Sequence, residues 1–184
     1  SKNLGCFGDG GLITTNDGDL AEMCRVMRAH GSKPKYYHKY VGGNFRLDTL
    51  QAAILSMKLP HLEKWHEGRR RNAAWYDKAL AGLPIGLPVI RPHNQMIYNQ
   101  YTIRVPDGRR DALRQRLASA CVGTEIYYPV PMHAQECFSY LGYRTGDMPA
   151  SEAAAREVLS IPIYPELKPE QMQHVADTIK DFYR

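Results

Sequence analysis

The sequence contains few cysteines, and none is placed to form an obvious bridge or metal site. Its four cysteines are scattered without a C-x-x-C pair, at Cys6, Cys24, Cys121 and Cys137. This spacing favours neither a disulfide framework nor a zinc site, and reduced thiols in a cytosol are the simplest interpretation. We therefore expect a cytoplasmic protein with no metal centre.

Long hydrophobic runs are also missing. The longest uncharged apolar run is far shorter than the ~20 residues that a membrane-spanning helix needs, and no charged segment precedes an apolar one as in a secretory signal. We expect no membrane partner. The 184 residues are 43% hydrophobic, 23% charged and 10% aromatic, which excludes a disordered or collagen-like chain. The length suits one large domain or two small ones.

Positive charge exceeds negative charge, with a formal net charge of +5. Such a balance is compatible with nucleic acid, with an anionic small ligand or with a basic surface, and does not choose among them. The densest basic run, Arg69 to Arg71, lies inside a helical pattern. Three successive arginines point around a helix in different directions, so we predict a solvated helix face there.

The first part of the chain predicts a hairpin followed by helices. Turn chemistry at Gly8 to Gly11, followed by a β-branched run, predicts a β-hairpin over residues 5–15. Helical spacing of apolar residues predicts a helix from about 18 to 30. A long helix is expected from near Asp48 to about Leu80, with a kink or short break at Pro60. The chain opens at Ser1 without an initiator Met, so we expect it to be the interior of a longer polypeptide.

The second part predicts a small α+β domain. Residues 81–92 are rich in proline and glycine, which indicates a domain crossing. The expected elements beyond it are a strand over Tyr98 to Val105, a helix around Leu113 and Leu117, a strand near Glu125 to Tyr128, a helix from about Ser151 to Leu159, the segment Ile161 to Ile163, and a last helix with Pro169 in its first turn. Several of the strands have short connections, which favours α+β over a doubly wound sheet.

Several polar side chains could carry chemistry, and each also has an ordinary structural interpretation. Lys2 alone would be a solvated charge. Asn44 could cap a following helix and Arg46 could pair with Asp48, although both side chains also suit phosphate oxygens. His133 could be a general acid, a ligand contact or a buried, hydrogen-bonded histidine. A further group, in a loop that could form a ligand wall or simply pack, comprises Tyr36, Tyr37 and His38.

Five ordered islands, read together, resemble the DegT/DnrJ/EryC1/StrS family of pyridoxal-phosphate-dependent sugar aminotransferases. They are residues 1–5, 8–11, 43–55, 128–133 and 159–165. The resemblance covers essentially the whole chain. It implies the C-terminal half of a type I PLP-dependent transferase, a mixed α/β and α+β fold. The implied domains are the end of the PLP-binding large domain (1–46), connecting helices (47–82) and a small C-terminal α+β domain (83–184).

The resemblance also implies roles for the candidate residues. Lys2 would form the Schiff base with pyridoxal 5'-phosphate, and Asn44 would reach across a homodimer interface to the phosphate of the partner's cofactor. Arg46 is the other candidate for that phosphate. The sugar nucleotide would meet the substrate-side candidates, which are Tyr36, Tyr37, His38, Tyr98 and His133. Groups that hold the cofactor ring are expected in the missing half, so the isolated fragment is expected to be inactive.

The implied activity is transfer of an amino group from an amino acid, with glutamate expected, to the 3- or 4-keto carbon of a nucleotide-linked sugar. Such a reaction serves biosynthesis of amino sugars for surface polysaccharide or natural products. Two alternatives stay open. One is a non-catalytic nucleotide- or nucleic-acid-binding regulatory module on the same scaffold, and the other is a PLP-dependent sugar dehydratase. Retention of Lys2 favours amino transfer, with no nucleic acid partner.

Overall fold

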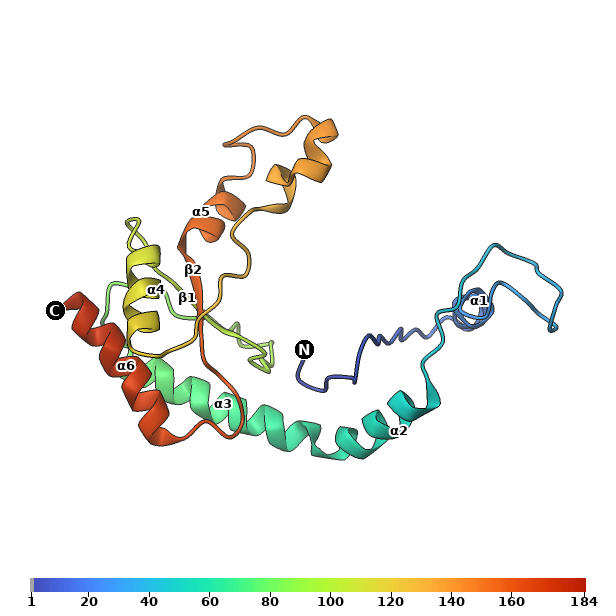
Figure 1. Ribbon diagram of the computed structural model, residues 1–184, viewed down its shortest axis with the longest axis horizontal. Helices are drawn as coiled ribbons and strands as arrows, with labels where there is room; N and C mark the ends of the chain where they lie inside the picture. The colour runs from blue at the N-terminus through green and yellow to red at the C-terminus, as the bar shows by residue number, and fades with distance from the viewer. Residues whose placement is uncertain (1) are drawn as a thin grey trace. The chain divides into compact units, whose positions relative to one another are not determined.

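The computed structural model describes residues 2–184 and divides into two compact units, Ser1–Leu62 and Glu63–Arg184 (Figure 1). No helix of the described residues is long and apolar enough to cross a membrane.

The first unit contains two α-helices and a short 3-10 turn. Helix α1 spans Gly18–Met27, and its N-cap residue Asp17 accepts hydrogen bonds from the backbone N–H groups of Asp19 (2.9 Å) and Leu20 (3.0 Å). These bonds satisfy donors that a helix start leaves unpaired. Helix α2 spans Thr49–Lys58 and is followed by η1, Leu59–His61. The predicted break at Pro60 is confirmed, because the proline lies inside η1 between α2 and the next helix.

The predicted hairpin over residues 5–15 is wrong. This segment contains neither a strand nor a backbone bridge. Its large apolar side chains are exposed, with Phe7 at 73%, Leu12 at 88% and Ile13 at 72%. A two-stranded hairpin is marginal unless an apolar face is covered, and within this unit nothing covers these side chains. Turn chemistry alone was therefore insufficient to make strands.

The second unit is built on a two-stranded antiparallel sheet. Strand β1, Tyr101–Arg104, pairs with β2, Val158–Ile161, in the register Tyr101↔Ile161 to Arg104↔Val158. Single bridges extend the pair on both sides, Gly86 to Arg104 and Glu125 to Ser160. The predicted strand near Glu125 to Tyr128 is thus reduced to one bridge. Pro129 and Pro131, which follow at once, have no backbone N–H to continue a ladder.

Helices make up much of the rest of this unit. They are α3, Leu62–Ala79, α4, Arg110–Ser119, α5, Pro149–Glu157, and α6, Pro169–Tyr183, with the 3-10 turns η2, Met132–Ala134, and η3, Glu136–Leu141. Residue Leu62 of α3 belongs to the first unit. The predicted helix near 151–159 ends two residues early, because Val158 and Leu159 already belong to β2.

The core lies between the sheet, α3, α4 and α6. Tyr101 and Ile103 alternate toward it from β1, and both are 0% exposed. Helix α6 contributes Met172, Val175 and Ile179, whose spacing of three and four places them on one face. The other fully buried side chains of the core include Ala73, Tyr76, Val105, Leu113, Leu117, Leu159 and Ala176.

The basic run on α3 is not a uniformly solvated face, which corrects the sequence-based expectation. Arg69 is half-buried, and its Nη1 donates to the carbonyls of Tyr98 (2.9 Å), Asn99 (3.2 Å) and Ile163 (2.9 Å). Burial lowers the pKa of this guanidinium from its ordinary value. The Arg69 side chain therefore ties two distant chain segments to the helix. Arg70 pairs with Glu63 of the same helix.

Candidate functional site

The segment that begins with Lys2 is fastened to helix α2. Lys58 Nζ donates to the carbonyl of Gly5 at 2.6 Å, and the Phe7 backbone N–H donates to Gln51 Oε1 at 2.7 Å. The Lys2 side chain itself is exposed. Two side chains of the same helix thus fix the chain just after Lys2, and the Lys2 amine stays open to a ligand.

Asn44 and Arg46 form a pair of hydrogen-bond donors in the same unit. Backbone bonds pin their segment to the end of α1, since His30 N donates to Gly43 O (2.9 Å) and Phe45 N donates to the Arg28 carbonyl (3.0 Å). Arg46 Nε donates to Asn44 Oδ1 at 2.9 Å. With Oδ1 directed at Arg46, the Asn44 amide has its NH₂ group available as a donor beside the guanidinium.

The structure shows neither helix capping by Asn44 nor pairing of Arg46 with Asp48. Helix α2 begins at Thr49, and its N-cap residue is Asp48. Asn44 is therefore not the cap, and Arg46 binds Asn44 rather than Asp48.

The loop between α1 and Asn44 has a tight base and an exposed tip. A Cβ on Gly42 would lie 2.4 Å from Gly31 N, so the two ends of the loop approach each other as closely as glycine allows. At the tip, Tyr36 is 77% exposed and Tyr37 is 72% exposed. His38 is held by its Nδ1 at 2.9 Å from the His30 carbonyl. The two tyrosines are thus displayed to solvent, whereas His38 is engaged with the loop base.

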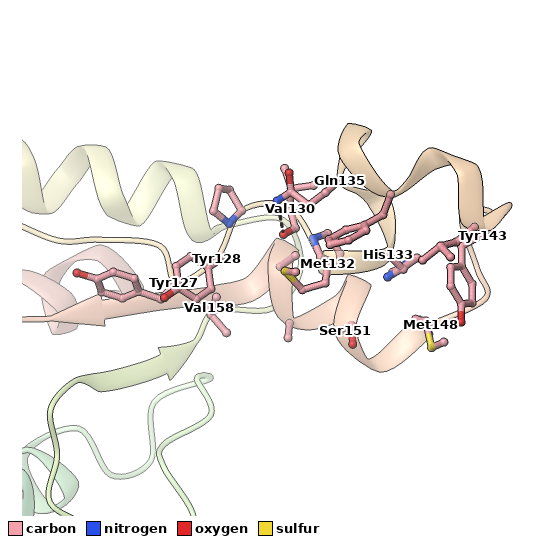
Figure 2. Close-up of a pocket in the computed structure, with 16 residues that line it drawn as sticks. Tyr127, Tyr128, Val130, Met132, His133, Gln135, Tyr143, Met148, Ser151 and Val158 are labelled. Atoms are coloured by element: carbon pink, nitrogen blue, oxygen red, sulfur yellow. Dashed lines mark hydrogen bonds between the residues drawn. The ribbon is translucent and has the colours of Figure 1, made fainter. Parts of the chain in front are cut away.

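The second unit contains a cavity of about 780 Å³ beside α5 (Figure 2). Its wall is mostly aromatic and apolar, and the predicted site residue His133 is part of it. The lining residues that Figure 2 labels are Tyr127, Tyr128, Val130, Met132, His133, Gln135, Tyr143, Met148, Ser151 and Val158. An apolar wall with a few polar groups is typical of a small-molecule site.

His133 is held in this wall by Glu152 of α5. Its Nε2 lies 3.1 Å from Glu152 Oε1, and the two side chains are 8% and 11% exposed. The Gly146 backbone N–H donates to the same carboxylate oxygen at 2.8 Å. The Gly146 hydrogen bond, joined by that of His133, lowers the pKa of Glu152 from its ordinary value, against the opposing effect of burial. Glu152 is thus held as a carboxylate facing the imidazole.

Tyr98, the remaining substrate-side candidate, lies in the core of the second unit. It is 8% exposed, and its ring stacks on Tyr101 with centroids 6.1 Å apart. Burial raises the pKa of its hydroxyl. A ring packed in this way has a structural role in the core of this unit.

The residue that sequence reasoning missed is Glu152, which lies 19 positions from His133 in the chain. Only the fold brings them together, so no local spacing could have indicated the pair. In the described part of the chain, no group of three or more His, Cys, Asp or Glu side chains could hold a metal ion.

The chain is similar to sugar aminotransferases over its whole length. It is 51% identical over 188 residues to the "Pleiotropic regulatory protein" of Geobacillus stearothermophilus, matching 100% of this chain and 50% of that protein. It is 43% identical to the dTDP-3-amino-3,4,6-trideoxy-alpha-D-glucose transaminase of Streptomyces venezuelae, matching 98% of this chain and 48% of that enzyme. The chain thus spans about half the length of these relatives.

A solved structure and a family profile support the same assignment. S. venezuelae DesV, solved in complex with a ketimine intermediate, matches with a TM-score of 0.95 and 43% identity over 99% of this chain and 49% of that one. This match confirms the predicted fold class. The profile of the DegT/DnrJ/EryC1/StrS aminotransferase family matches residues 1–180. The chain belongs to that family.

Proposed function

We propose that the full-length protein is a pyridoxal-phosphate-dependent aminotransferase that moves an amino group from an amino acid, with glutamate as the donor, to a keto-sugar nucleotide. Transaminases acting on dTDP- and UDP-linked sugars are among its relatives at 43% and 40% identity. The observation in this chain that carries the proposal is the exposed Lys2 amine on a segment fastened to α2, in the unit that also displays the Asn44–Arg46 donor pair.

The chemistry of this donor set fits the cofactor. A phosphate needs N–H donors and positive charge. The bond from Arg46 Nε occupies the Asn44 oxygen at 2.9 Å and leaves amide and guanidinium N–H groups for a phosphate. We propose that Lys2 is the point of covalent attachment and that Asn44 and Arg46 bind the phosphate. When bound, the cofactor supplies an electron sink that makes the donor's Cα–H acidic.

The chain's own residues then act on protons and on orientation. Lys2 Nζ, once free, is a base that removes a proton from the Cα of the amino donor. On the sugar side, we propose that Tyr36, Tyr37 and His38 line the nucleotide-sugar entrance and that His133 contacts the substrate from the wall of its cavity. The four cysteines are free thiols, which suits a biosynthetic enzyme of the cytoplasm.

The test of the activity uses the full-length protein with pyridoxal phosphate, glutamate and a panel of keto-sugar nucleotides. We expect visible absorbance that borohydride fixes covalently at Lys2, and turnover that consumes glutamate. Lys2→Ala should lose both, whereas Lys78→Ala, which removes an exposed lysine of α3, should keep both. A colourless protein would refute the proposal. Turnover without glutamate consumption would indicate a dehydratase, and salt-sensitive DNA binding would indicate the regulatory alternative.

We further propose that the enzyme is a homodimer in which Asn44 serves the partner's cofactor. Co-expression of Lys2→Ala with Asn44→Ala tests this directly. If Asn44 acts across the interface, a mixed dimer has one site with both defects and one intact site, so activity returns. If Asn44 acts within its own chain, every site carries a defect and the mixture stays as inactive as the single variants.

A further inference from the structure

We propose that Glu152 is a positioning residue for His133, which it orients so that Nδ1 is presented to the cavity for a polar group of the sugar nucleotide. This inference rests on the proposed function, because it specifies how one substrate contact of that function is built.

The imidazole of His133 is fixed on two sides. Its Nε2 lies 3.1 Å from Glu152 Oε1, and the ring of Tyr143 meets it edge-on, with centroids 6.0 Å apart and planes at 80°. Both side chains of this hydrogen bond are almost fully buried, at 8% and 11% exposure. A buried hydrogen bond to a carboxylate restricts ring rotation more strongly than a solvated one.

The carboxylate is itself fixed, so it can serve as a reference point. Glu152 lies in the first turn of α5, and its Oε1 accepts the Gly146 N–H at 2.8 Å. Gly146 has a φ of +99°, a conformation that favours glycine. The turn that contains it is closed by Arg144 N donating to Asp147 Oδ2 at 2.8 Å. A closed turn and a helix thus hold the oxygen that faces His133.

This arrangement decides which imidazole nitrogen is available. A carboxylate accepts hydrogen bonds, so it favours a proton on Nε2. The other nitrogen, Nδ1, is then an acceptor in the neutral ring and a donor in the charged ring. His133 lines a wall that is otherwise largely apolar, with neighbours such as Met132, Phe138 and Met148. A single oriented nitrogen in such a wall is suited to a hydroxyl or carbonyl oxygen of a sugar.

The experiment compares the two half-reactions of the full-length enzyme in Glu152→Ala and Glu152→Gln. The matched control is Glu136→Gln, which removes an exposed carboxylate of η3. The first half-reaction uses glutamate, and the second uses the keto-sugar nucleotide that gives the highest turnover in the panel above. We expect Glu152→Ala to slow the sugar half-reaction about 10-fold and to leave the glutamate half-reaction within about twofold. Glu152→Gln, which keeps an acceptor oxygen, should have a smaller effect, and Glu136→Gln should have none.

Two further measurements separate positioning from general damage. Nitrogen NMR of the histidine-labelled enzyme without sugar should show His133 protonated at Nε2, and this preference should be lost in Glu152→Ala. In the sugar half-reaction, Glu152→Ala combined with His133→Gln should be no slower than His133→Gln alone, since Glu152 acts through His133.

Equal slowing of both half-reactions, additive effects in the double variant, or an unchanged His133 tautomer would overturn the inference. Failure of the proposed function has a different signature, because the wild-type protein would then transfer no amino group at all. The NMR measurement would still decide whether Glu152 orients His133.

Discussion

Two neighbouring tyrosines in the core of the second unit should respond oppositely to loss of their hydroxyl groups. Tyr76 of α3 and Tyr101 of β1 are both 0% exposed, and their ring centroids are 5.2 Å apart. The Tyr101 hydroxyl donates to Asp77 Oδ1 at 2.6 Å. The Tyr76 hydroxyl is buried and has no hydrogen-bond partner among residues 2–184. Replacing each by phenylalanine therefore makes the same chemical change in two different polar environments.

The magnitudes follow from these environments. Hydrogen bonds to charged groups stabilise a protein by about 1.5–3 kcal/mol. Asp77 is only partly buried, so water can replace part of the lost bond, and we expect Tyr101→Phe to cost about 1–2 kcal/mol. An unpaired buried hydroxyl costs about 1–3 kcal/mol. Removing it in Tyr76→Phe should therefore be neutral or stabilising, by about 1 kcal/mol.

Hydrogen exchange followed by mass spectrometry of the full-length protein measures these effects locally. Peptides that cover α3 and β1 should exchange faster in Tyr101→Phe and no faster than wild type in Tyr76→Phe. Denaturant unfolding of the same variants gives the sign for the whole protein. If Tyr76→Phe destabilises the core as much as Tyr101→Phe, the assignment of an unsatisfied hydroxyl is refuted.

Three further predictions concern the same fold. Burial raises the pKa of Tyr101 above its ordinary value of 10.0, so its stabilising contribution is present below that pH and is lost as the pH rises above it. Above pH 10, the unfolding free energy of Tyr101→Phe should therefore fall less steeply with pH than that of the wild type, by about 1.4 kcal/mol per pH unit. Gly42→Ala, whose Cβ would lie 2.4 Å from a backbone nitrogen, should cost about 3 kcal/mol and speed exchange in the loop, whereas Gly11→Ala, with nothing within 4 Å, should not. Arg69→Met leaves three carbonyls without their donor and should lower the unfolding free energy by about 2–3 kcal/mol. The control Arg71→Met, at an exposed arginine, should lower it by under about 0.5 kcal/mol. Equal losses in the two variants would contradict a stabilising role for the Arg69 hydrogen bonds.

Elements that depend on local chemistry were predictable from the sequence. The break at Pro60 follows from the missing N–H of proline, and the start of the last helix follows from Pro169 in its first turn, and both are observed. Elements that depend on a distant partner were not. The predicted hairpin over residues 5–15 does not form, since its apolar side chains are uncovered within the described part of its unit. The predicted strand near Glu125 is limited to one bridge with Ser160. Sequence patterns report the tendency of a segment, whereas a strand also needs a neighbour.

The same distinction explains the candidate site. The islands of family sequence located Lys2, Asn44, Arg46 and His133 because those residues lie inside recognisable local motifs. The contacts that orient their side chains are set by the fold. The Arg46 side chain turns to Asn44 instead of Asp48 and thereby orients the amide, with Oδ1 facing the guanidinium. Glu152 reaches His133 only because α5 packs beside the 3-10 turn that carries the histidine. Motifs thus name the candidate groups, whereas long-range packing decides how each group is oriented, and for this reason substitution of the packing partners is the sharper test of the proposed site.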